Sequence, residues 1–102
     1  MYRWHQALEG DKILSAEAKR KLFTPHVKVV ESSNSFYGYG WVIETTRRNT
    51  TLQWHNGGNA YFYADFRRLP QDRVMVYWAT NEFDKVSEKV TDRLIRMALG
   101  SE

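Results

Sequence analysis

The chain has 102 residues, of which 42% are hydrophobic and 15% aromatic, and its formal net charge is +3. This length fits a single domain spanning residues 1–102, and the aromatic content supplies enough apolar surface for a core, which excludes a disordered protein. No run approaches the roughly 20 apolar residues that cross a bilayer, so we expect no membrane partner. The absence of cysteine excludes disulfides, thiolate metal sites and a thiol nucleophile.

Two short helices are predicted at the start of the chain. Residues 2–9 form a helical segment that Gly10 interrupts. Ser15 is followed by small residues and an acid, a pattern typical of a helix N-cap with a negative first turn. This second helix, over residues 15–23, ends before Pro25 because the residue preceding a proline avoids the helical conformation.

The middle of the chain has the composition of a β-sheet. A polar stretch over residues 31–35 indicates a loop. Aromatic and β-branched residues then predict strands at 37–46, 50–55, 60–66 and 73–80. Segments typical of turns separate them, at 47–49, 56–59 and 69–72. Because these connections are short, we expect neighbouring strands to be antiparallel.

A third helix is predicted over residues 84–99 and ends at Gly100. Its apolar side chains recur at helical spacing, at Val86, Val90, Leu94, Ile95, Met97 and Ala98. We therefore expect an α+β fold: an antiparallel sheet of three to four strands, covered by the C-terminal helix, with an N-terminal helical segment.

The charged residues and the histidines give no sign of a polyanion or metal site. Lys19–Lys21 and the arginine pairs 47–48 and 67–68 are interpreted as solvated helix faces or turns, which makes a nucleic-acid partner unexpected. The three histidines, His5, His26 and His55, lack metal-ligand spacing and have no thiolates to join them. We expect no metal and no cofactor.

The segment from Trp54 to Asn59 has two interpretations. Asn56-Gly57 between alternating runs is a strong signal for a β-hairpin turn. Alternatively, an imidazole at a strand end, followed by glycines, presents His55 and bare backbone N–H groups to one point, where they could bind a developing oxyanion.

Five groups of residues, in this order, resemble the serine β-lactamase-like family, which includes class C-type β-lactamases, D-amino-acid peptidases and related esterases. The resemblance covers nearly the whole chain and is to the C-terminal part of such enzymes. It rests on Trp4-x-x-Ala7-Leu8-x-Gly10-x-x-Ile13-Leu14-Ser15-x-Glu17, Leu22-Phe23-Thr24-Pro25, Tyr37-Gly38-Tyr39-Gly40-Trp41, His55-Asn56-Gly57-Gly58 and Pro70…Asn81.

The resemblance implies a role for each matching position. His55-Asn56-Gly57 looks like the family's third motif, Lys-Thr-Gly or His-x-Gly, on a strand beside the cleft. By resemblance, His55 holds the substrate carboxylate or tunes the hydroxyl network, and the backbone N–H of Gly58 is one of two oxyanion-hole donors. The expected ligand-binding residues are His55, Asn56, Gly57, Gly58, Trp41 and Tyr61.

The family's first two motifs are missing. No serine is followed three residues later by lysine, and no Tyr-x-Asn occurs. Without a nucleophile, one oxyanion donor cannot run acyl transfer. We therefore predict that the chain is catalytically inactive alone, and is a serine acyl hydrolase only when a partner chain completes the site.

Such a truncated half is expected to associate with another chain. Residues 74–78 are apolar on both faces, and an unpaired strand edge invites pairing, so we expect a homo-oligomer or a complementing chain. The N-terminus lacks the apolar core of a signal peptide, which indicates a cytoplasmic protein if Met1 is the natural start.

Two other functions remain open from the sequence. The first is a small-molecule or peptide-binding module that uses aromatic rings, namely Tyr37, Tyr39, Trp41, Trp54 and Tyr61. The second is an interaction or nucleic-acid-binding module that uses Arg47, Arg48, Arg67 and Arg68.

Overall fold

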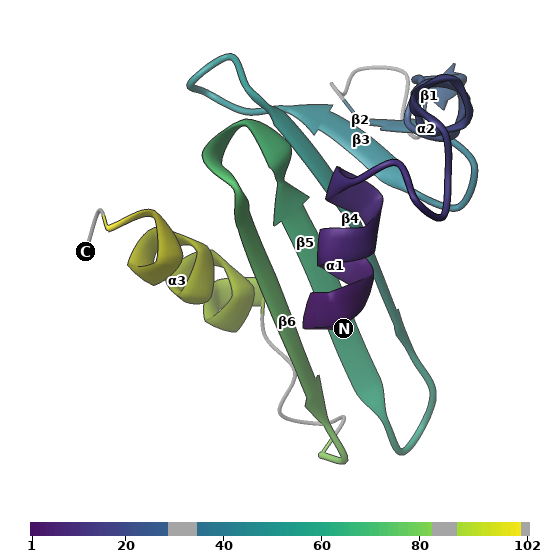
Figure 1. Cartoon of the computed structure of the whole chain (residues 1–102). Helices are drawn as coiled ribbons and strands as arrows, with labels where there is room; N and C mark the ends of the chain where they lie inside the picture. Colours follow the sequence, from purple (N-terminus) through teal and green to yellow (C-terminus); the bar gives the residue numbers. More distant parts are fainter. Residues whose placement is uncertain (29–34, 83–87, 101–102) are drawn as a thin grey trace.

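The chain folds around a six-stranded antiparallel sheet whose strands follow one another in chain order (Figure 1). The structure is a computed structural model that describes residues 1–28, 35–82 and 88–100. Within these residues, three α-helices and one 3-10 turn accompany the sheet: α1 (Tyr2–Glu9), α2 (Ala16–Leu22), α3 (Glu88–Leu99) and η1 (Pro70–Asp72). The strands are β1 (Val27–Lys28), β2 (Ser35–Tyr37), β3 (Val42–Thr45), β4 (Thr51–Gly58), β5 (Tyr63–Leu69) and β6 (Val74–Thr80).

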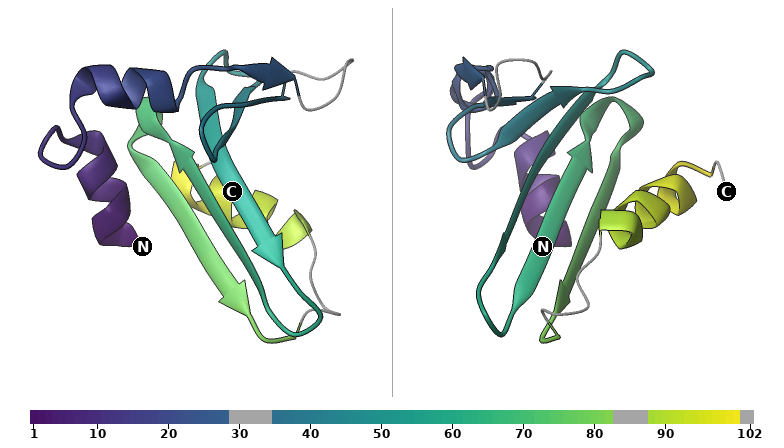
Figure 2. Two further views of the ribbon diagram at one scale, coloured as in Figure 1. Left: turned by 90° about the vertical axis from the view of Figure 1, so that its right-hand side faces the viewer. Right: turned by 180° about the vertical axis from the view of Figure 1, so that it is seen from behind.

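The helices lie on both sides of the sheet (Figure 2). On one face, His5 of α1 accepts a hydrogen bond from Arg68 of β5. On the other face, Thr91 of α3 donates to Asp65 of the same strand. Positions 65 and 68 point to opposite faces because side chains alternate along a strand. The predicted α+β fold and C-terminal helical cover are therefore confirmed, and α1 covers the second face.

The sheet has six strands, where three to four were predicted. The run 37–46 is divided, because a turn in which Gly38 N donates to Trp41 O at 2.8 Å separates β2 from β3. Gly38 allows this turn to lie against α2: a Cβ there would collide with the backbone carbonyl of Leu22. The short, exposed strand β1 has no periodicity that could reveal it, and Ser35, assigned to a loop, begins β2. Residues 31–34 of that predicted loop lie outside the described residues.

The turn predicted at 56–59 is also displaced. Strand β4 continues through the glycines, and its last pair with β5 is Gly58 with Tyr63. The reversal follows at residues 59–62, where the Asn59 side chain accepts hydrogen bonds from the backbone N–H groups of Tyr61 and Phe62, each at 2.8 Å. The asparagine that makes the turn is therefore Asn59, and Asn56 belongs to the strand.

Helix α3 ends as predicted, at Gly100 with a φ of +73°. Its predicted first turn, 84–87 with Val86, lies outside the described residues. Leu94 and Ile95 are half-buried, but Val90 and Met97 of the predicted apolar stripe remain 40% and 56% exposed. The helix also buries a residue that hydropathy did not single out, because Thr91 is 1% exposed.

The arginine pair 67–68 does not lie in a solvated turn, as predicted, but within β5. Arg68 is 2% exposed, and Arg67 donates from Nε to Asp65 at 3.1 Å while its guanidinium stacks 4.1 Å from the Trp54 ring centroid. Arg68 joins β5 to α1 and Arg67 makes its contacts within the sheet, so both are withdrawn from any basic patch. The apolar core consists of Leu8, Val42, Ile43, Leu52, Phe66, Leu69 and Val76.

Candidate functional site

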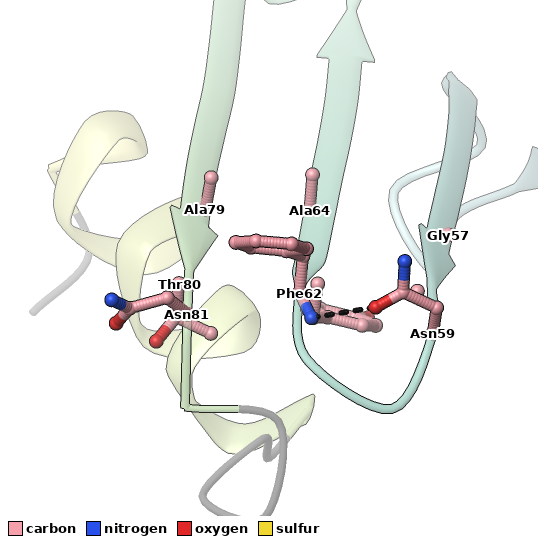
Figure 3. A pocket seen from close by; sticks show the side chains of 9 residues that line it. Gly57, Asn59, Phe62, Ala64, Ala79, Thr80 and Asn81 are labelled. Carbon is pink, nitrogen blue, oxygen red and sulfur yellow. Dashed lines mark hydrogen bonds between the residues drawn. The ribbon is translucent and has the colours of Figure 1, made fainter.

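An open cavity of about 760 Å³ lies where β4, β5 and β6 end together (Figure 3). Across these strands, Gly57, Ala64 and Ala79 are paired in one row. All three residues are small, so none of them fills the space above the sheet, and Figure 3 shows the Phe62 ring lying between Ala64 and Ala79. The full lining is Gly57, Gly58, Asn59, Phe62, Tyr63, Ala64, Ala79, Thr80 and Asn81.

Gly58 lines this cavity, and the direction of its backbone N–H follows from the strand register. Asn59 N donates to Phe62 O at 2.9 Å, so residue 59 is hydrogen-bonded toward β5. Successive N–H groups of a strand point alternately to its two sides, so Gly58 N–H points away from β5. On that side, β3 pairs with β4 only as far as Trp54. The Gly58 N–H therefore lies outside the backbone ladders of the described sheet.

His55 lies three residues before Gly58, on the same strand, and is exposed. Its Nδ1 is 2.5 Å from the backbone carbonyl of Asn56, which can only accept a hydrogen bond, so Nδ1 carries the proton. The Tyr37 hydroxyl lies 3.4 Å from Nε2, the other ring nitrogen. The imidazole is thus oriented by contacts at both of its nitrogens.

The remaining predicted site residues lie elsewhere. Asn56 alternates to the opposite face from His55 and donates from its amide to the Tyr63 hydroxyl at 3.0 Å. Trp41 packs between Phe23 and Phe66, with centroids 5.4 and 5.5 Å away. Tyr61 is 71% exposed.

Of the six expected ligand-binding residues, Gly57 and Gly58 line the cavity and His55 precedes them on β4. Sequence reasoning did not single out Ala64 and Ala79, because small residues signal a bare surface only once the strand register is known.

The other two histidines have separate surroundings. His26 is exposed and stacks on Tyr39 with centroids 4.6 Å apart. His5, expected at most half-buried, is 3% exposed. Burial lowers the pKa of His5, the Arg68 charge lowers it further, and Glu9 partly offsets both. Within residues 1–28, 35–82 and 88–100, no three metal-ligating side chains of His, Asp or Glu come together.

The two serines that the structure describes serve local hydrogen bonds. Ser15 Oγ accepts from Ala18 N at 3.1 Å and caps α2, as predicted. Ser35 Oγ donates to a Glu44 carboxylate oxygen at 2.6 Å. Among the described helices, none has the length and apolar character needed to cross a membrane.

Comparison with known proteins gives one relative in sequence and one in structure. Penicillin-binding protein 4* of Bacillus subtilis (strain 168) is 27% identical over 90 residues, which are 87% of this chain and 20% of that protein. The octameric penicillin-binding protein homologue from Pyrococcus abyssi matches with a TM-score of 0.79 at 22% identity, over 93% of this chain and 22% of that one. No family model matches.

These matches confirm the resemblance that the motifs predict. The chain is similar in sequence and in fold to a fragment of penicillin-binding proteins, and it spans about a fifth of the length of both relatives.

Proposed function

We propose that this chain supplies one wall of a penicillin-binding-protein-like acyl-transfer site and turns over no substrate by itself. In this proposal, the reactive serine and its lysine come from a segment outside these 102 residues, because the sequence has no Ser-x-x-Lys. The observation that carries the proposal is the direction of the Gly58 N–H, which points away from β5 and past the end of β3, outside the backbone ladders of the described sheet.

The chemistry follows from what this wall can offer. A backbone N–H that is fixed in place and outside the sheet ladder can stabilise the negative oxygen of a tetrahedral intermediate. His55 offers an imidazole whose Nε2 lies 3.4 Å from the Tyr37 hydroxyl, suited to hydrogen bonding with a substrate or a hydroxyl network. Neither group is the nucleophile of this proposal. This wall therefore binds the substrate and polarises its carbonyl group, but it does not attack the carbonyl carbon.

The small residues Gly57, Ala64 and Ala79, and above all the open space beside Gly57, support completion by another segment. Added side chains would be needed to fill the cavity, and a Cβ at Gly57 would meet no atom within 4 Å. An element carrying the nucleophile could therefore approach β4 closely at Gly57. Both relatives are about five times as long as the region that matches this chain. The rest of each relative contains sequence that could supply such an element.

A second chain or a further segment would also cover the edge of the sheet. β6 is an outer strand, and an unpaired edge tends to acquire a partner strand. Val90 and Met97 of α3, the helix that packs on this side, add exposed apolar surface. The similar Pyrococcus abyssi protein is octameric, which supports a homo-oligomer or a complementing chain here.

Hydrolysis assays test the catalytic part of the proposal. The chain alone should hydrolyse a chromogenic cephalosporin and p-nitrophenyl esters no faster than buffer. His55→Ala and Ser35→Ala variants serve as controls, since contamination by another hydrolase would give a rate that neither variant alters. A rate that falls in either variant would show that the isolated chain contains a working site, contrary to the proposal.

Sedimentation tests the assembly part. At micromolar concentration the chain should sediment as a dimer or larger species, and a Val90→Glu/Met97→Glu variant should shift it toward monomer. A stable wild-type monomer at that concentration would argue against self-association.

A further inference from the structure

A second cavity, of about 480 Å³, lies between α1, α2 and the opposite end of β4 and β5 from Gly58. Arg68 is four residues beyond Ala64, about 13 Å along β5 at the usual rise of a strand. The cavity is rich in positive charge: four cationic side chains and one carboxylate line it. The residues that carry the argument are Glu9, Lys19, Arg20, Phe23, Arg68 and Arg73.

Arg68 is buried among neutral hydrogen-bond acceptors. It is 2% exposed, its Nε donates to His5 Nδ1 at 3.0 Å, and its Nη1 donates to Gln53 Oε1 at 2.7 Å. Burial lowers the pKa of His5, which favours a neutral imidazole, and an arginine keeps its proton in proteins. The guanidinium charge therefore has two good hydrogen bonds but no charge to oppose it in either partner.

No carboxylate of the described residues forms an ion pair with Arg68 within 4.0 Å. The carboxylate that lines the cavity, Glu9, lies 3.3 Å from His5 Nε2 instead. Burial lowers the pKa of Arg68 and the more distant Glu9 only partly offsets it. A buried charge is normally paired, but none of the described carboxylates contacts this guanidinium directly, and Glu9 acts on it only from beyond His5.

The other three cations that line the cavity differ from Arg68 in exposure or pairing. Arg20 of α2 and Arg73, which follows η1, are exposed and form no ion pair with the described residues. Lys19 is already committed to Asp11 at 2.9 Å. Phe23, 5.5 Å from the Arg68 guanidinium, contributes an aromatic wall.

We propose that this cavity binds a small organic anion, whose phosphate or carboxylate group is held by Arg68 between Arg20 and Arg73 and whose apolar part lies against Phe23. Guanidinium groups match both oxyanions with paired N–H donors. Nη2 of Arg68, which donates to no described residue, is the nitrogen left for the ligand. This site is separate from the Gly58 cavity and does not depend on the function proposed for it.

Titration of the full chain with phenyl phosphate, benzoate and inorganic phosphate tests the site, by calorimetry and by NMR amide shifts. We expect saturable binding of phenyl phosphate or benzoate, with NMR amide shifts at residues that line the cavity. Where phenyl phosphate binds, inorganic phosphate should compete with it. The better of the two ligands identifies the head group. Arg20→Gln and Arg73→Gln should each weaken binding about fivefold or more, as expected for loss of a charge-assisted hydrogen bond.

Arg47→Gln is the matched control, because it removes the same charge from an exposed turn away from the cavity. It should change affinity less than about twofold. Arg68→Gln should abolish binding; the two surface variants keep the test valid if this buried variant unfolds. The proposal is overturned if no probe saturates at millimolar concentration, or if Arg47→Gln weakens binding as much as Arg73→Gln does.

Discussion

Thr91 of α3 donates a hydrogen bond from Oγ1 to Asp65 Oδ2 of β5 at 2.7 Å, and both residues are only 1% exposed. The same hydroxyl accepts from Trp78 Nε1 at 2.8 Å, so one oxygen joins the helix to two neighbouring strands. Arg67 neutralises the buried carboxylate from within β5. The C-terminal helix is thus fixed to the sheet by a polar contact as well as by its apolar side chains.

Replacing Thr91 by Val should test this contact. The substitution keeps the side-chain shape but removes one hydrogen bond from Asp65, which retains Arg67, and leaves the Trp78 indole N–H without its acceptor. We therefore expect the free energy of unfolding to fall by about 1–3 kcal/mol. Urea denaturation measures the change. Thr45→Val, in an exposed position of β3, is the control and should change stability by less than about 0.5 kcal/mol. Equal effects of the two variants would contradict the role of the contact.

Stability should fall as the pH is lowered through the range in which His5 titrates. The pKa of folded His5 lies below its ordinary value of about 6.5, chiefly because of burial. Below that value the unfolded chain binds a proton that the folded chain excludes, so stability decreases with falling pH until the folded pKa is reached.

Urea midpoints at several pH values between about 7.5 and 5 would check this direction. A His5→Asn variant, which can still accept from Arg68 but does not titrate, should show a flatter dependence over this range. Identical slopes in the two proteins would mean that another group is responsible.

Docking of α1 should depend on Leu8, which is 3% exposed. Truncation to Ala removes buried methyl groups and leaves a cavity, at an expected cost of about 2–4 kcal/mol. Ile13→Ala, at a site that is 62% exposed, should change stability by less than about 0.5 kcal/mol. Chemical denaturation would compare them, and a Leu8→Ala chain as stable as Ile13→Ala would show that α1 contributes little.

Gly38 and Gly57 should respond differently to an added methyl group. Gly38→Ala places a Cβ against the Leu22 carbonyl, so we expect a loss of about 1–3 kcal/mol as α2 shifts. Gly57→Ala meets no atom within 4 Å and should leave stability nearly unchanged. Thermal unfolding of both variants measures the difference. A tolerant Gly38 would mean that α2 does not lie against the β2–β3 turn.

The helices were predictable because their signals are local. Ser15 as a cap and Gly100 as a stop act on their own neighbours. The strand boundaries were not predictable in this way. The turn at Gly38 depends on a contact with α2 that leaves no room for a Cβ, and the turn after β4 is made by Asn59 in place of Asn56. Likewise, the burial of Arg68 depends on acceptors that are 15 and 63 residues away in the chain.

The candidate site was predictable in its backbone and less so in its side chains. The glycines after His55 indicated an exposed N–H, and the register places Gly58 accordingly. Trp41 was expected to contact a ligand but packs against Phe23 and Phe66, since aromatic composition cannot distinguish a core ring from a binding ring.

The N–H of Gly58 is the feature that decides whether this wall belongs to an acyl-transfer site. The most direct measurement is acylation by a fluorescent penicillin after this chain replaces the matching fifth of the Bacillus subtilis relative. We expect labelling of the chimera, slowed about 100-fold or more by Gly58→Pro, which removes the N–H at the end of the strand, and little changed by Gly58→Ala, which keeps it. A Gly58→Pro chimera labelled as fast as Gly58→Ala would contradict the account.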